Sequence, residues 1–191
     1  MQDLPTTHPA SLLGIVNDSR ALGFEMSCEA RVGSLLATLA ASKPSGRFLE
    51  LGTGTGAGSA WLLDGMSSDA TLTSVEADSR VQAVAVKHLG SDPRATFTTA
   101  DADEWLSGYD GEPFDMAFVD CRPGKFHRLG DLLALLRIGG LYVADDLLPQ
   151  PTWPADHPSR VNVFLGRLPE VPGMRAMTME WASGVVLGAR V

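Results

Sequence analysis

Four glycines alternate with small residues in the segment 48–60, which reads FLELGTGTGAGSA. We expect an apolar strand to run into the first glycine and a helix to begin near Ser59. Glycine has no Cβ atom, so it permits a tight strand-to-helix turn and lets a ligand approach the backbone. N–H groups at the start of the helix would face that ligand. The alternative is a tight turn without a ligand. The residues predicted to bind a ligand in this loop are Gly52, Thr53, Gly54, Gly56 and Ser59.

The loop also fits the pattern of dinucleotide-binding proteins, through Gly52, Gly54 and Ala57. Glu50 separates the two kinds of ligand, because it stands two residues before the first glycine. A carboxylate there would repel a pyrophosphate group. It would attract an ammonium group, such as that of a methionine moiety, directly or through water. The sequence therefore favours a ligand with an ammonium group over a dinucleotide.

Two more acids follow the next two predicted strands. Glu76, in the segment VEAD, could accept hydrogen bonds from both hydroxyls of a ribose, and it would serve NAD equally well. Asp101, in TTADADEWL, could accept a hydrogen bond from an adenine amino group or could cap the following helix. Ala77 and Ala102 follow these acids and are included in the predicted nucleoside site. Open α/β sheets bind ligands at the edge where such strands end.

Short apolar runs alternate with longer helical ones, which predicts a parallel α/β sheet in a single domain spanning residues 1–191. The predicted strands are residues 47–51, 71–76, 95–99, 114–120, 141–144, 174–181 and 184–189. The predicted helices between them are residues 59–63, 79–89, 103–106, 126–136 and 160–168. The N-terminal segment 1–45 is predicted to form helices at residues 8–22 and 29–41. Residues 182–184 leave no room for a helix, so the last two strands should pair antiparallel.

The composition argues against several classes of protein. A chain of 191 residues that is 45% apolar can form a core without disulfides, and two cysteines suggest no disulfide framework. The formal charge of −8 repels phosphate backbones, so we expect no nucleic-acid partner. No apolar run approaches the roughly 18 residues of a membrane span, and the N-terminus lacks the pattern of a signal peptide. We therefore expect a cytoplasmic protein with no membrane partner.

The order of five motifs resembles that of class I S-adenosylmethionine-dependent methyltransferases. The motifs are FLELGTGTG, VEAD, ADADEWL, FDMAFVD and LLRIGGLYVADDLL. From about Glu29 to the C-terminus, the chain is similar to the small O-methyltransferases related to catechol and caffeoyl-CoA O-methyltransferases. The resemblance implies a Rossmann-like α/β fold. Its seven-stranded, mostly parallel sheet would have the order 3-2-1-4-5-7-6, an antiparallel last strand and helices on both faces. It also implies S-adenosyl-L-methionine as cofactor and a small hydroxylated acceptor, aromatic acceptors included.

The same resemblance implies a metal site. In that family a divalent metal is held by an Asp after the fourth strand and by Asp-Asn after the fifth. These positions correspond to Asp120 and to Asp145 and Asp146, so the family's Asn is an Asp here. Three carboxylates at one sheet edge would suit a hard cation, Mg²⁺ or another divalent ion. The alternative is that these acids cap loops and that one of them orients the acceptor. Asp120 is also included in the predicted cofactor site.

The family often has a lysine near the acceptor hydroxyl, three residues after the Asp of the fourth strand. Pro123 occupies that position here, and Lys125 lies two residues later. Lys125 could reach the site through a reshaped loop or could be only a solvated charge. The predicted catalytic residues are Asp120, Lys125 and Asp145. The residues expected to be structural or to lie on the surface are Cys121, His127 and His157.

Residues 147–158 contain four prolines and Trp153, a composition that excludes a regular helix. Trp153 is expected either to form an apolar wall of the acceptor pocket or to pack onto the core. Two other functions stay open, an NAD(P)-binding Rossmann oxidoreductase and a non-catalytic nucleoside-binding protein. A homodimer also stays open, because N-terminal helices of the resembled family often hold dimer contacts.

Overall fold

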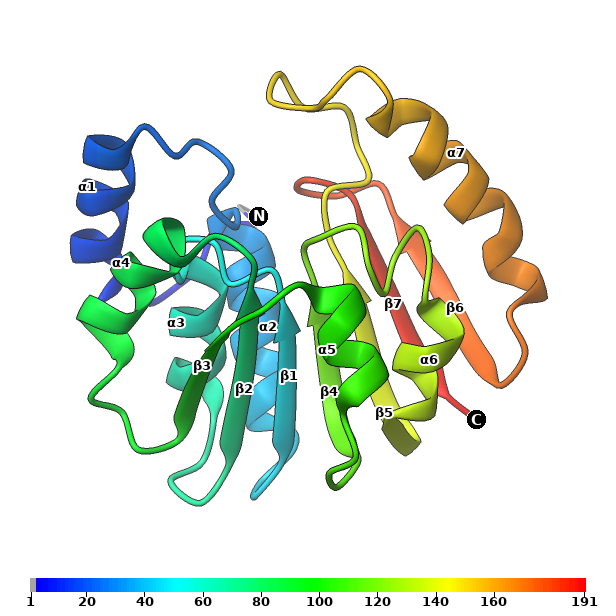
Figure 1. The fold of residues 1–191 in the computed structure, drawn as a ribbon, viewed down its shortest axis with the longest axis horizontal. Coiled ribbons are helices and arrows are strands. Elements are labelled where there is room, and N and C mark those ends of the chain that lie inside the picture. The colour runs from blue at the N-terminus through cyan, green and yellow to red at the C-terminus, as the bar shows by residue number, and fades with distance from the viewer. Residues whose placement is uncertain (1–2) are drawn as a thin grey trace.

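The computed structural model describes residues 3–191, and a seven-stranded sheet forms its centre (Figure 1). The strands are β1 (Arg47–Leu51), β2 (Thr71–Glu76), β3 (Ala95–Thr99), β4 (Phe114–Val119), β5 (Leu136–Ala144), β6 (Met174–Met179) and β7 (Val185–Arg190). Their order in the sheet is β3-β2-β1-β4-β5-β7-β6. β7 runs antiparallel to both β5 and β6, and the other neighbours pair in parallel. The predicted strand order and the antiparallel finish are both confirmed.

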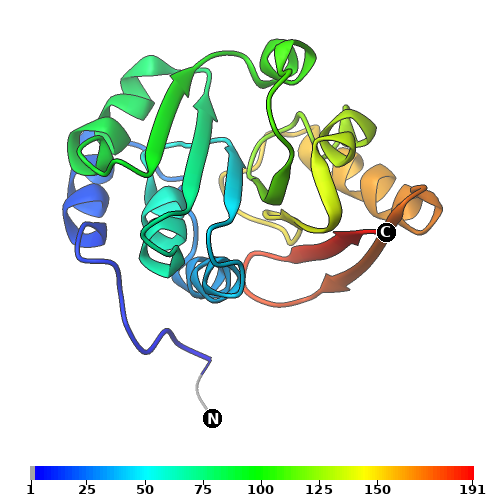
Figure 2. The ribbon, with the colours of Figure 1, turned by 90° about the horizontal axis from the view of Figure 1, so that it is seen from below.

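Helices cover both faces of the sheet, as predicted (Figure 2). They are α1 (Leu12–Leu22), α2 (Ala30–Ala41), α3 (Ala57–Gly65), α4 (Ser79–Leu89), α5 (Ala102–Gly108), α6 (Leu129–Ala134) and α7 (His157–Arg167), with a 3-10 turn at Leu168–Glu170. None of the helices described within residues 3–191 has the length and hydropathy that a membrane span requires.

Alternation along the strands divides the core into two layers. Phe48 of β1 packs with the layer of α1 to α4, whereas its neighbour Leu49 packs with the layer of α5 to α7. In β4, Phe118 and Val119 divide between the layers in the same way. Successive side chains of a strand point to opposite faces, so a strand that is apolar at every position needs helices on both sides. The apolar runs in the sequence therefore account for the two helical layers.

Most predicted elements agree with the structure within two residues, but four boundaries are wrong. The helix predicted at residues 126–136 is reduced to α6, because a turn occupies residues 123–128: Pro123 bridges to His127, and Arg128 has a left-handed φ of 59°. β5 begins at Leu136 rather than at residue 141, and its pairing with β4 shifts register near Phe114. The Gly-Gly pair in this stretch hid the strand from the sequence pattern.

The other two wrong boundaries are helix starts. α1 begins at Leu12 rather than at residue 8, and its first N–H bonds to the carbonyl of Pro9. α7 begins at His157 rather than at residue 160, and Pro158 lies in its first turn. Proline is tolerated there because the first N–H groups of a helix have no intrahelical partner. The exclusion of a regular helix therefore holds only up to residue 156.

Helix α2 of the N-terminal segment approaches α3, the helix after β1, closely. Gly33 of α2 lies against the indole of Trp61, and Gly65 of α3 lies against the backbone of Ala37. A Cβ atom at either glycine would overlap these neighbours. The packing of the N-terminal helical segment on the sheet domain thus depends on glycine at two helix contacts.

We expect Gly65→Ala to lower the free energy of unfolding by about 1–3 kcal/mol, because the new methyl group would meet rigid backbone of α2. The matched control is Gly166→Ala in α7, where a Cβ atom would meet nothing within 4 Å. That change should stabilise the protein by up to about 1 kcal/mol through helix propensity. Denaturant unfolding of both variants is the measurement. Equal effects of the two substitutions would contradict the close packing of α2 on α3.

Candidate active site

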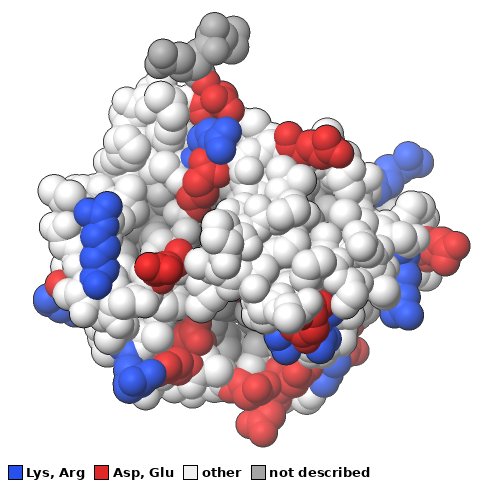
Figure 3. Space-filling view, turned by 90° about the horizontal axis from the view of Figure 1, so that it is seen from above, with Lys and Arg blue, Asp and Glu red and all other residues white. Residues whose placement is uncertain are grey.

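A cavity of about 620 Å³ opens at the edge of the sheet where β1, β2, β4 and β5 end. The face above these strand ends is hollowed, and acidic side chains lie beside the hollow (Figure 3). The walls come from the glycine loop after β1, from residues 24–29 between α1 and α2, and from the segment after β5. The last two segments lie over the strand ends (Figure 1). Parallel topology thus brings the chemistry-bearing residues of distant segments to one edge.

The glycine loop bends sharply at three positions. Gly52, Gly54 and Gly56 have φ values of 95°, 53° and 95°, a region that residues other than glycine rarely adopt. A Cβ atom at Gly52 would also lie 2.8 Å from the carbonyl oxygen of Asp120. Gly52, Thr53 and Gly54 line the cavity, together with Thr55, which the sequence analysis did not single out. Gly56 and Ser59 face the protein interior instead and do not line the cavity.

Glu50 is completely buried at the end of β1. Its Oε2 accepts hydrogen bonds from the hydroxyls of Ser59 and Ser74. Its Oε1 is buried without a partner in the described part of the chain, and a Cβ atom at Gly58 would collide with it. Burial raises the pKa of Glu50 to about 7, although the two serine bonds oppose the shift. Because Glu50 lines the cavity, its unpaired oxygen suits the ammonium group that the sequence led us to expect.

Glu76 lies at the end of β2 and lines the cavity. Its Oε2 accepts from the N–H of Gly54 at 2.9 Å, and its Oε1 accepts from the N–H groups of Ala77 at 2.9 Å and Asp78 at 3.1 Å. The carboxylate therefore fastens the glycine loop to the end of the neighbouring strand. Each carboxylate oxygen can accept more than one bond, so capacity for ligand hydroxyls remains.

Three residues of the predicted nucleoside site lie outside the cavity wall: Ala77, Asp101 and Ala102. Asp101 is exposed and caps α5, with its Oδ1 accepting from the N–H of Asp103 at 2.7 Å. The capping alternative thus has structural support. A contact between Asp101 and an adenine stays a prediction.

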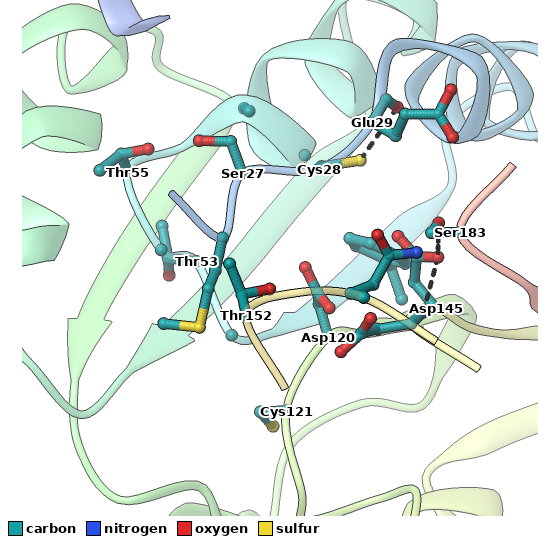
Figure 4. A pocket seen from close by; sticks show the side chains of 18 of the residues that line it. Ser27, Cys28, Glu29, Thr53, Thr55, Asp120, Cys121, Asp145, Thr152 and Ser183 are labelled. Carbon is teal, nitrogen blue, oxygen red and sulfur yellow. Dashed lines mark hydrogen bonds between the residues drawn. The ribbon is translucent and has the colours of Figure 1, made fainter. Parts of the chain in front are cut away.

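Asp145 and Asp120 lie side by side where β5 and β4 end (Figure 4). Asp145 is buried and accepts hydrogen bonds from the hydroxyl of Ser183 and, at 2.7 Å, from the N–H of Asp146. Burial raises the pKa of Asp145, and the Ser183 bond opposes the shift. Burial and the adjacent charge of Asp145 hold the pKa of Asp120 well above its usual range, and the Lys125 charge opposes them.

Asp146 turns toward the segment that follows β5. Its backbone adopts a left-handed φ of 64°. Its Oδ1 accepts from the indole N–H of Trp153 at 2.5 Å, and its Oδ2 lies 3.5 Å from Nε2 of His157. The rings of Trp153 and His157 lie 4.4 Å apart between centroids. Both line the cavity, so this aromatic pair forms one wall, and His157 has a role there that the sequence analysis did not assign.

Lys125 reaches the acid cluster. Its side chain is buried, and its Nζ donates to the backbone carbonyl of Asp145 at 2.7 Å. The Nζ also lies 5.2 Å from the centroid of the Phe126 ring. The turn at residues 123–128, which shortens α6, directs this lysine inward. The reshaped-loop alternative is therefore the one found, and the alternative of a solvated charge is wrong.

The three expected metal ligands do not form one ligand group within residues 3–191, although Asp120 and Asp145 are neighbours. Asp145 is engaged by Ser183, and Asp146 is engaged by Trp153. Within residues 3–191, no group of three or more His, Cys, Asp or Glu side chains is arranged to hold a metal ion. The side chains described here thus do not fit the three-carboxylate metal site that the resemblance implied. Cys121 lies apart from the two acids, and burial raises the pKa of its thiol, as expected for a structural cysteine (Figure 4).

Residues 49–147 match a family whose description is methyltransferase domain. The chain belongs to this family. Two curated relatives, from Mycolicibacterium vanbaalenii and Mycobacterium ulcerans, are provisionally assigned O-methyltransferases. They are 33% and 34% identical over 117 residues, which cover 59% of this chain and 52% of each relative. The chain thus spans about half the length of the curated relatives it matches.

Solved methyltransferases share the fold of the whole chain. TomG from Streptomyces achromogenes, an O-methyltransferase crystallised with S-adenosylmethionine, matches with a TM-score of 0.84 and 24% identity over 96% of this chain and 91% of TomG. An O-methyltransferase from Bacillus cereus, crystallised with S-adenosylhomocysteine, matches with a TM-score of 0.84 and 19% identity over 99% of this chain and 94% of that one. The Rossmann-like class I methyltransferase fold is therefore confirmed.

The buried Glu50 predicts a pH-dependent stability. Its carboxyl group has a pKa of about 7 when folded against a reference value of 4.5, so folding favours the protonated form. The group therefore destabilises the ligand-free protein progressively as the pH rises from about 4.5 to about 7. Glu50→Gln removes this effect, and its stability relative to the unchanged protein should rise by about 3 kcal/mol across that interval.

Denaturant unfolding at a series of pH values is the measurement, and Glu180→Gln, at an exposed position, is the control. A constant stability difference between Glu50→Gln and the unchanged protein from pH 5 to pH 8 would contradict the buried carboxyl group.

Proposed function

We propose that this protein transfers a methyl group from S-adenosyl-L-methionine to a hydroxyl oxygen of a small acceptor molecule. The buried, unpaired Oε1 of Glu50 carries the proposal, because an ammonium group at this position would satisfy an otherwise costly orphan acceptor. A pyrophosphate there would meet a carboxylate, which disfavours NAD(P). The assignment of the curated relatives as O-methyltransferases supports oxygen as the methylated atom.

The chain's own residues divide the task between two parts of the cavity. Glu50 would hold the ammonium group of the cofactor, the glycine loop would let the cofactor approach the backbone of the protein, and Glu76 would accept hydrogen bonds from the ribose hydroxyls. Bound S-adenosylmethionine supplies a methyl group activated by its sulfonium charge. Trp153 and His157 wall the acceptor part, which suits a planar molecule. Alignment of the acceptor oxygen with the methyl group is the main requirement of such a displacement.

Asp120 is the carboxylate best placed to take the acceptor proton. It lines the cavity, and burial and neighbouring charges shift its pKa upward, toward the range in which a carboxylate accepts a proton efficiently. Asp145, engaged by Ser183, serves to position the cluster. Asp120 would take the proton of the acceptor hydroxyl. Bound S-adenosylmethionine would supply the methyl group to the acceptor oxygen, and the electron pair of the broken carbon–sulfur bond would stay on sulfur. The predicted homodimer and cytoplasmic location stay predictions.

The proposal predicts that two substitutions at the nucleoside part of the site have different effects, one on ligand binding and the other on stability. Glu76→Ala should weaken S-adenosylmethionine binding by about 2–3 kcal/mol, because bonds to a charged acceptor are lost. Asp101→Ala should lower the free energy of unfolding by about 1 kcal/mol through loss of the α5 cap. If Asp101→Ala also weakens S-adenosylmethionine binding, that result would support the predicted contact between Asp101 and the adenine. Calorimetric titration with S-adenosylmethionine and denaturant unfolding measure the two effects.

NAD is the comparison ligand in the same titrations. Tight binding of NAD without binding of S-adenosylmethionine would overturn the proposed function. Unchanged S-adenosylmethionine affinity of Glu76→Ala would show instead that the ribose assignment is wrong. Glu76→Gln is the milder variant, because its amide oxygen can still accept from the N–H of Gly54. Its amide nitrogen loses the bonds from the N–H groups of Ala77 and Asp78.

A further inference from the structure

Lys125 is one of few buried charged side chains in the described part of the chain, and it lies in the acceptor half of the cavity. A buried ammonium group is costly unless opposite charges and hydrogen-bond acceptors surround it. Here the carbonyl oxygen of Asp145 accepts its bond at 2.7 Å, and the charges of Asp120 and Asp145 lie close enough to interact with it. The lysine and the two acids therefore form one electrostatic unit.

The hydrogen-bond partners of Asp145 and Asp146 show which carboxylate oxygens near Lys125 are already occupied. Ser183 and the N–H of Asp146 occupy Asp145, and Trp153 occupies Asp146. Asp146 binds the indole of the aromatic wall, and its Oδ2 lies 3.5 Å from Nε2 of His157. Its negative charge still raises the pKa of Asp120 and of Asp145. Asp120 and Asp145 are the two carboxyl groups whose pKa the Lys125 charge lowers. A single positive charge between them offsets part of their mutual repulsion.

We propose that the Lys125 ammonium group is the resident cation of the acceptor site, so that this chain positions Asp120 and its acceptor without a divalent metal. The inference rests on the proposed function and deepens it. When the acceptor oxygen loses its proton to Asp120, the ammonium group lies in the same cavity wall and offsets the developing negative charge. Lys125 is thus a positioning residue, which acts on the acids and on the local charge of the acceptor site.

The test is a titration of the S-adenosylhomocysteine-bound protein with Mn²⁺, followed by electron paramagnetic resonance and by calorimetry. The unchanged protein should show no saturable Mn²⁺ binding up to about 1 mM. Lys125→Met keeps most of the length of the side chain and removes its charge, which leaves two carboxylates without a cation. This variant should bind Mn²⁺ roughly tenfold or more tightly than the unchanged protein.

Lys87→Met is the matched control, because it removes the same charge from an exposed ion pair with Asp18, on the α1 and α4 side of the molecule. It should bind no Mn²⁺. Lys125→Arg keeps the positive charge and should behave like the unchanged protein. Circular dichroism and S-adenosylhomocysteine binding check that each variant is folded.

Stoichiometric Mn²⁺ binding by the unchanged protein would overturn the inference, and it would do so even if Lys125→Met failed to fold. A folded Lys125→Met variant that binds no Mn²⁺ would also overturn it. Failure of the unchanged protein to bind S-adenosylhomocysteine would contradict the proposed function instead, so the two failures are distinguishable.

Discussion

The arrangement of this sheet edge depends on the hydrogen bonds of one carboxyl group, that of Glu50, which is buried beneath the glycine loop. One of its oxygens joins Ser59 of α3 to Ser74 of β2, so the start of the helix is fastened to the neighbouring strand. The other has no partner in the described residues. A buried acceptor of this kind is costly without a hydrogen bond. The fold therefore keeps a group in place that a ligand ammonium would stabilise, and glycine at position 58 leaves the room for it.

The topology of the sheet places the acids of the acceptor site beside the glycine loop of the cofactor site. β4 pairs with β1, and β5 pairs with β4, so their carboxyl ends bring Asp120 and Asp145 next to the glycine loop. The antiparallel β7 adds Ser183 from the opposite direction of the chain, at the hairpin that precedes this strand. The neighbouring carboxylates of Asp120 and Asp145 repel each other, and the turn after β4 supplies Lys125 as the compensating charge.

The sequence predicted the parts that depend on local patterns. Short apolar runs and turn residues indicated all seven strands, although β5 begins earlier than predicted. The spacing of Glu50 before Gly52 indicated both the turn and the chemistry of the ligand. The contacts that no local pattern reports were missed. The bond between Ser183 and Asp145 joins residues 38 positions apart, and the left-handed turn that directs Lys125 inward left no periodic signal. Asp101 shows a different limit of the sequence. A helix cap and an adenine contact require the same residue at the same place, so the sequence does not separate the two roles.

A crystal structure of the protein with S-adenosylhomocysteine tests the central claim most directly. The account predicts that the ammonium group of the ligand lies within about 2.7–3.2 Å of Glu50 Oε1, or joins it through one ordered water, with the ribose hydroxyls on Glu76. A ligand whose ammonium group binds elsewhere, with Glu50 Oε1 still unpaired beneath the glycine loop, would contradict the account.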